Sequence, residues 1–149
     1  MNDLVQFLRD RLAEDERIAR AATPSPWEQT PEKVGCLASA EYWEVVDCTG
    51  TPMARENAEH VARHDPARVL REVEAKRRRL TRHVPERRRL TLLDKDGGAT
   101  SFGFYVCTSC TPNRTIEHGQ EVVEWPCLDV RDDALPYAGH PDYRDDWRP

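Results

Sequence analysis

The chain has 149 residues, 27 acidic and 22 basic, and a net charge of −5. This length fits one domain. Leu, Ile, Val and Phe together supply only 28 residues, but four Trp, four Tyr and the modest charge indicate a folded protein with a small core rather than a disordered one. The sequence has no apolar run of membrane-spanning length, and its start lacks the apolar stretch of a secretory signal. We therefore expect a cytoplasmic protein that does not enter a membrane and keeps its thiols reduced.

The first 48 residues predict a helix followed by strands. Asp3 is a candidate N-cap, and the helix should run to about Ala22, because the prolines within residues 23–26 cannot continue it. A strand or an irregular crossing should begin at Trp27. Residues 41–48 are rich in aromatic and β-branched side chains, which predicts a strand before a turn at residues 49–52 and a short partner strand near Met53.

Two helices should follow. A short one is predicted over residues 56–64, and a longer central helix starts with Asp65 as N-cap and Pro66 in its first position. The central helix should end near His83, because Pro85 lies just beyond. Residues 85–93 are ambiguous, with a strand as one alternative. Residues 100–107 and 120–125 predict two antiparallel strands, and residues 127–138 a helix, after which the segment from His140 should pack through Tyr143 and Trp147.

Cys107 and Cys110 form a C-x2-C pair, and Cys127 follows seventeen residues later. Two cysteines at this spacing can bind one metal ion from a tight turn, and zinc takes Cys and His ligands in a closed tetrahedral site. Three histidines compete for the fourth position: His83 at the end of the central helix, His118 and His140. We expect a structural zinc ion, with His83 the best placed; buried thiols without a metal are the alternative.

Two blocks of sequence carry a resemblance to a known family. Residues 57–77, from Asn57-Ala58-Glu59-His60-Val61-Ala62-Arg63-His64 onwards, and residues 134–144, Ala-Leu-Pro-Tyr-Ala-Gly-His-Pro-Asp-Tyr-Arg, resemble an uncharacterised family of small proteins from actinobacteria and their phages. The first block also loosely resembles phage early proteins of the Ead type. The family pattern implies a histidine after the central helix, a C-x2-C and a cysteine before the last helix, which fall on His83, Cys107, Cys110 and Cys127. The resemblance implies no activity.

Other chemistry is less favoured by the residues. A redox C-x2-C opens a helix, whereas Thr111-Pro112-Asn113 predicts a turn here. His60 and His64 are spaced as helical metal ligands are, but no glutamate stands where a zinc protease needs its base. Solvated or partly buried helix histidines are therefore the simpler interpretation. Cys36 and Cys48 could be a second pair across a hairpin, although small buried residues are the simpler interpretation.

Charge is unevenly spread along the chain. Ten basic residues against three acidic ones lie between residues 68 and 89, and nine acidic against three basic ones lie between residues 117 and 149. The acidic segment could lie across the basic helix and neutralise it. The basic stretch could instead contact nucleic acid, through the arginines at Arg77, Arg78, Arg79, Arg87, Arg88 and Arg89.

These observations predict one α+β domain over residues 1–149. Its parts are an N-terminal helix, a small antiparallel sheet, a central helix and, over residues 83–149, a zinc-stapled C-terminal module with a β-hairpin and a helix. We expect a non-enzymatic, zinc-containing interaction protein of bacterial or phage origin, with another protein as its partner. A regulator that binds nucleic acid through the arginine-rich helix and an enzyme with an unrecognised site are the alternatives.

Overall fold

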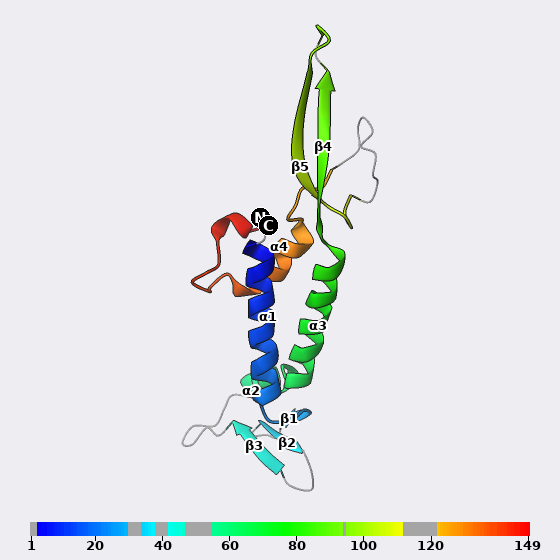
Figure 1. The fold of residues 1–149 in the computed structure, drawn as a ribbon. Coiled ribbons are helices and arrows are strands. Elements are labelled where there is room, and N and C mark those ends of the chain that lie inside the picture. Colours follow the sequence, from blue (N-terminus) through cyan, green and yellow to red (C-terminus); the bar gives the residue numbers. More distant parts are fainter. Residues whose placement is uncertain (1–2, 30–33, 38–41, 47–54, 94, 112–121) are drawn as a thin grey trace. The chain divides into compact units, whose positions relative to one another are not determined.

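The computed structural model describes residues 3–29, 34–37, 42–46, 55–93, 95–111 and 122–149, and the fold is α+β as predicted (Figure 1). The chain divides into two compact units. One comprises Asp10–Ala75, and the other comprises Met1–Arg9 with Lys76–Pro149. Helices α1 (Asp3–Ala21) and α3 (Pro66–Arg82) each contribute to both units. The expectation of a single domain stays a prediction.

The unit Asp10–Ala75 contains a three-stranded antiparallel sheet in the order β1-β2-β3. Its strands are β1 (Trp27–Gln29), β2 (Val34–Leu37) and β3 (Tyr42–Val46). The sheet confirms the strand expected at Trp27 and most of the strand expected over residues 41–48. The turn at residues 49–52 and the partner strand near Met53 lie outside the described residues.

Helix α3 starts where the sequence predicts, and the backbone amides of its first turn have hydrogen-bond acceptors. Pro66 has no N–H, the amide of Ala67 donates to Ser25 Oγ at 2.8 Å, and the amide of Arg68 donates to Asp65 Oδ1 at 2.8 Å. The amide of Val69 donates to the Asp65 carbonyl at 3.2 Å, which begins the helical hydrogen bonds. Asp65 is therefore the N-cap of α3. It follows α2 (Arg55–Arg63), the short helix expected over residues 56–64.

Helix α1 starts one residue earlier than the sequence predicts. Asp3 is the first residue of α1 itself rather than the residue before it, and its carboxylate accepts a hydrogen bond from Arg144 Nη1 at 3.2 Å. The residue that caps α1 lies outside the described residues.

The second unit contains a long two-stranded hairpin, which resolves the ambiguous segment 85–93 as a strand. Strand β4 (Pro85–Leu93) pairs antiparallel with β5 (Ala99–Cys107), from Pro85 opposite Cys107 to Leu93 opposite Ala99 (Figure 1). The segment expected to pair with β5, residues 120–125, is described from residue 122 onwards, and this part does pair with β5. There the Cys107 amide donates to the Val123 carbonyl at 3.1 Å, and the Trp125 amide donates to the Tyr105 carbonyl at 3.0 Å.

The core of this unit forms where the ends of the chain meet the last helix. Helix α4 (Leu128–Ala134) continues as a 3-10 turn, Leu135–Tyr137, and matches the helix expected over residues 127–138. Trp147 is buried and its ring lies 5.1 Å from that of Phe7, while Tyr143 lies 6.0 Å from Phe7. The expected packing of the C-terminal segment through Tyr143 and Trp147 is confirmed. Leu8, Val106 and Val130 are fully buried in the same unit.

Candidate metal centre

His83 lies at the junction between α3 and β4. Its amide donates to the Arg79 carbonyl at 2.9 Å, in the last turn of the helix, and Pro85 starts the strand two residues later. Proline cannot continue a helix, and it holds the residue before it in an extended conformation. The side chain of His83 is thus placed by a sharp change from helix to strand.

Residues 107–110, here called the cysteine knuckle, turn back against the same junction. Ser109 Oγ donates to the Arg82 carbonyl at 2.6 Å, and the Thr108 amide donates to the Val84 carbonyl at 3.0 Å. The knuckle closes on itself through a 2.8 Å hydrogen bond from the Thr111 amide to the Cys107 carbonyl. Carbonyls in the last turn of a helix lack intrahelical partners, so the knuckle supplies a donor to the end of α3.

Cys127 reaches the same place from the start of α4. It is the residue before the helix, with an extended backbone, and its carbonyl accepts hydrogen bonds from the Val130 and Arg131 amides, each at 3.1 Å. The hydrogen bonds of Val123 and Trp125 to β5 hold the preceding segment beside the hairpin.

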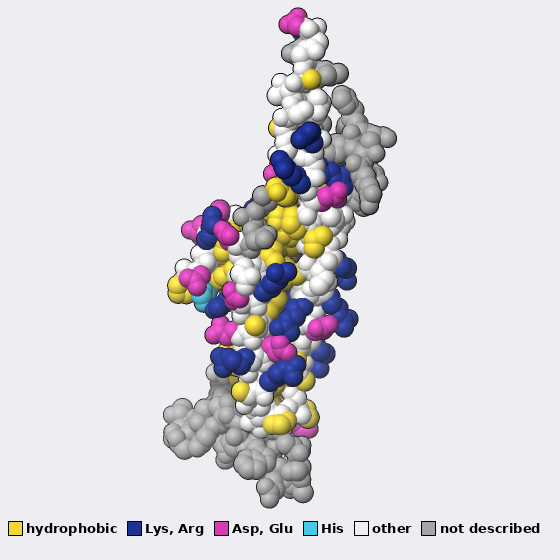
Figure 2. Space-filling model, in the orientation of Figure 1, with side chains coloured by type: hydrophobic (Ala, Val, Ile, Leu, Met, Phe, Trp, Pro, Cys, Tyr) yellow, Lys and Arg dark blue, Asp and Glu magenta, His cyan; other side chains and the backbone are white. Residues whose placement is uncertain are grey.

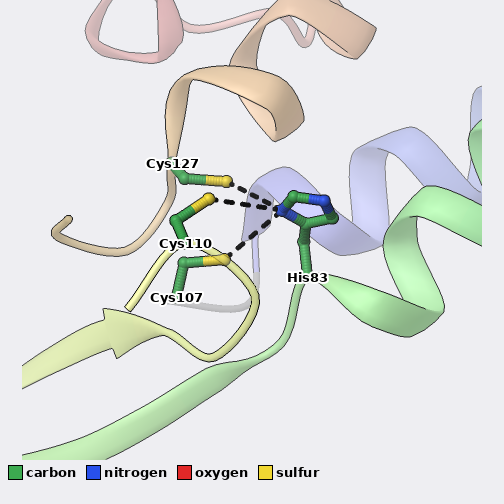
Figure 3. A group of neighbouring side chains, drawn as sticks. All are labelled: His83, Cys107, Cys110 and Cys127. Atoms are coloured by element: carbon green, nitrogen blue, oxygen red, sulfur yellow. Dashed lines mark hydrogen bonds between the residues drawn. The ribbon is translucent and has the colours of Figure 1, made fainter. Parts of the chain in front are cut away.

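These three segments bring four ligand atoms together (Figure 3). Nδ1 of His83 lies 3.4 Å from Cys107 Sγ, 3.6 Å from Cys110 Sγ and 3.4 Å from Cys127 Sγ. All four ligand atoms lie within 4.8 Å of one another. Cys107 and Cys127 are buried, whereas Cys110 and His83 are half-buried. The four residues are close enough to bind one metal ion.

Two of the three thiols are hard to ionise in these surroundings. Burial first, and then the neighbouring Cys107 and Cys127, raise the pKa of the Cys110 thiol to about 12. Burial also raises the pKa of Cys127, and a backbone hydrogen bond from Val130 acts in the opposite direction. Thiolates that are buried side by side repel one another and lose hydration, so a nearby cation would stabilise them.

A carboxylate that was not among the predicted site residues also lies beside the cluster. Oδ2 of Asp129 is 3.7 Å from His83 Nδ1 and 3.8 Å from Cys110 Sγ. Its side chain is 53% exposed, unlike the thiols of Cys107 and Cys127. The only signal in the sequence is its position two residues after Cys127, in the first turn of the helix.

His60, His64 and His140 are not among the four clustered ligands. His140 packs its ring 5.6 Å from that of Phe7, and its Nδ1 accepts the Asp142 amide at 3.1 Å, so it is not among the clustered ligands. His118 lies outside the described residues. The rings of His60, in α2, and His64, the residue after α2, lie 4.2 Å apart, and both side chains are exposed to solvent. In the described part of the chain they belong to no group of three or more metal-ligating side chains.

The structure describes only the backbone of Cys36 in the second candidate pair, Cys36 and Cys48. Cys36 is in β2, opposite Trp43 of β3, so it does lie on a hairpin. Its side chain and the whole of Cys48 lie outside what the structure describes.

The six arginines predicted to contact nucleic acid have different surroundings. Arg79 pairs with Asp133, and Arg88 is buried, where its Nη2 donates to Glu86 Oε2 at 3.1 Å and to the Thr111 carbonyl at 3.3 Å. Arg87 and Arg89 are exposed on β4. Arg77 and Arg78 lie in the last two turns of α3, half-buried and exposed respectively, and both take part in interactions within the protein. Nucleic-acid binding itself stays a prediction.

Among the described residues, no helix has both the length and the apolar character that crossing a membrane requires. No curated protein and no solved structure matches the chain. One family match covers the whole chain and confirms the expectation of an uncharacterised family, whereas origin in actinobacteria or phages and likeness to Ead-type proteins stay predictions. The match is to the "Family of unknown function (DUF6221)", over residues 1–149, and the chain belongs to this family.

Proposed function

We propose that His83, Cys107, Cys110 and Cys127 bind one zinc ion, and that this ion has a structural role. The observation that carries the proposal is the set of three distances from His83 Nδ1 to the thiols, 3.4, 3.6 and 3.4 Å. Zinc binds sulfur at about 2.3 Å and imidazole nitrogen at about 2.0–2.1 Å, so a tetrahedral site separates nitrogen from sulfur by about 3.6 Å. The three nitrogen–sulfur distances therefore support a tetrahedral zinc site.

The chemistry of the ligands supports zinc over hard cations. Calcium and magnesium take oxygen ligands, whereas thiolate and imidazole suit zinc. Burial raises the pKa of two of the three thiols, and a divalent cation at the centre of the cluster offsets this cost because it stabilises the thiolates directly.

A structural role fits the number and the origin of the ligands. Three cysteines and one histidine fill a tetrahedral zinc ion, so no position is left for a substrate. The ligands come from the α3–β4 junction, the cysteine knuckle and the start of α4, which lie far apart in sequence. A metal here therefore crosslinks the C-terminal module, in a chain whose supply of core residues is small.

The protein then acts by binding another molecule rather than by catalysis. Another protein is the partner that we expect, in the reducing cytoplasm of a bacterium or of a phage-infected cell. Two exposed apolar side chains support a protein partner: Leu128 and Leu135 are 62% and 44% exposed and stand seven residues apart on the last helical segment. Side chains at this spacing lie on one helical face.

Metal analysis of the purified protein tests the zinc assignment. We expect about one zinc per chain, a lower melting temperature in a strong chelator, and recovery on adding zinc. Replacement by cobalt should give the visible absorption of tetrahedral thiolate coordination. Protein that contains no zinc, takes up neither metal and melts identically with and without chelator would overturn the proposal.

A further inference from the structure

The structure separates the arginines of the basic stretch into those that are engaged within the fold and those that are available. Arg79 and Arg88 hold Asp133 and Glu86. Arg82, Arg87 and Arg89 are exposed, and no carboxylate of the described residues pairs with any of them. These three arginines, here called the arginine set, are therefore free to neutralise an external anion.

Two members of the arginine set share one face of the hairpin. Arg87 and Arg89 stand two residues apart on β4, so both side chains leave the same face, about 7 Å apart along the strand. Their partners in register on β5 are Tyr105 and Gly103, and Thr91 pairs with Ser101 further along. The face thus combines two cations with hydroxyl groups and, in the described residues, no carboxylate.

The absence of a side chain at Gly103 shapes this face. A Cβ atom built on Gly103 would lie 3.2 Å from Arg87 Nε and 3.3 Å from Arg87 Nη2. The guanidinium of Arg87 therefore lies across β5 in the space that glycine leaves. Glycine at this position therefore leaves room on the face for the exposed guanidinium of Arg87.

The third arginine lies close in sequence to the other two, at the end of α3. Arg82 ends α3, its carbonyl accepts a hydrogen bond from Ser109 of the cysteine knuckle, and His83 follows directly as a ligand. Only His83, Val84, Pro85 and Glu86 separate Arg82 from Arg87. The same four-residue cluster that we assign to zinc thus holds the end of the helix and the base of the hairpin. Figure 2 shows Lys and Arg side chains gathered at this base.

We propose that the arginine set binds the sugar–phosphate backbone of a nucleic acid. Arginine and hydroxyl side chains are the usual contacts to phosphate oxygens, and a two-stranded β-ribbon is narrow enough to enter a major groove. A polyanion responds to local positive potential, so the net charge of −5 on the whole chain does not prevent binding at one basic face. This inference goes beyond the proposed zinc site, and it adds a second ligand to the protein partner that we propose above.

The test compares two double variants of the full-length, zinc-loaded protein. Arg87→Gln with Arg89→Gln removes two charges from the arginine set. Arg144→Gln with Arg148→Gln removes two charges from exposed arginines that already pair with Asp146 and Asp145, so it is the matched control for net charge. Fluorescence anisotropy with a labelled random-sequence duplex, and with its single strand, measures affinity over a series of salt concentrations.

We expect the wild-type affinity to fall with salt, each phosphate contact adding about 0.7–0.9 to the log–log slope. The Arg87/Arg89 variant should bind on the order of tenfold more weakly at low salt and lose about 1.4–1.8 of that slope, while the control stays close to wild type. Equal losses in both variants, or no binding by the wild type at low salt, would overturn the proposal, and the absence of binding would favour a protein partner. Zinc-loaded protein that binds no nucleic acid refutes this inference alone. Protein that takes up no zinc but binds nucleic acid refutes the metal assignment alone.

Discussion

Arg79, on α3, donates a hydrogen bond from Nη1 to Oδ1 of Asp133, on α4, at 2.8 Å. The carboxylate is 5% exposed, whereas the arginine side chain is 38% exposed. Asp133 is one of nine acidic residues in the C-terminal third of the chain, and it does pair with the basic helix. Other members of the acidic segment pair locally instead, as Asp145 and Asp146 do with Arg148 and Arg144. Within the described residues, the acidic segment therefore neutralises only part of the basic stretch.

Asp133 should make the free energy of unfolding depend on pH. Burial raises its pKa above the ordinary 3.8, although Arg79 and then Lys76 act in the opposite direction. The native state therefore holds a proton that the unfolded state has released, and this group's contribution to stability falls as pH rises from 3.8 to the raised pKa. Asp133→Asn should remove that fall, which cannot exceed about 1.4 kcal/mol per pH unit. Urea unfolding at a series of mildly acidic pH values measures it.

The useful quantity is the difference between wild type and Asp133→Asn at each pH. Protonation of the candidate metal ligands affects both proteins and cancels in this difference. A difference that stays constant across the series would show that Asp133 titrates in the native state as it does in the unfolded chain.

Removing one thiol should destabilise the C-terminal module. Cys107 is fully buried, and Cys107→Ser replaces the thiol that we propose as a zinc ligand with a hydroxyl that binds zinc poorly. Because metal-binding free energy in such modules is also folding free energy, we expect loss of the metal and a melting temperature lower by more than about 10 °C. Metal analysis and a thermal melt check both.

Cys36→Ser is the matched control, since it makes the same chemical change on β2, in the unit Asp10–Ala75. It should retain the metal. If Cys107→Ser keeps its metal and melts as the control does, the thiol of Cys107 is not a ligand.

The fourth ligand can be assigned by comparing histidine variants. His83→Ala should lose zinc, because Nδ1 of His83 is the nitrogen that lies 3.4–3.6 Å from all three thiols. His140→Ala should keep zinc and lose only the ring contact to Phe7. Zinc content per chain after dialysis distinguishes the two. Retention of zinc by His83→Ala and its loss from His118→Ala would move the assignment to His118.

The sequence anticipated those features that depend on neighbouring residues. The Asp65-Pro66 pair predicts the start of α3 because an N-cap acts within one turn. The C-x2-C spacing likewise points to a metal turn at Cys107 and Cys110. The predicted end of the central helix and the family pattern both point to His83. The family pattern also points to Cys127, which follows the C-x2-C pair in the chain.

The surroundings of Arg88 could not be predicted in this way. In the run from Arg87 to Arg89 three identical residues carry no amphipathic pattern, so nothing local indicates which one is buried. The answer depends on the register of β4 against β5 and on the carbonyl of Thr111, twenty-three residues away. The pairing of β4 with β5 could not be predicted for the same reason. The charged residues within 85–93 obscure the alternation of polar and apolar side chains that is typical of a strand.

The N-cap of α3 gives the last prediction. Asp65→Ala leaves the Arg68 amide without its 2.8 Å acceptor, while Ser25 still accepts from Ala67. Loss of one cap typically costs about 1 kcal/mol, and urea unfolding measures the free energy. Asp65→Asn is the matched control, because asparagine caps about as well as aspartate and should restore most of that loss. If alanine is tolerated as well as asparagine, the hydrogen bond to Arg68 contributes nothing, and Pro66 together with Ser25 is sufficient to start the helix.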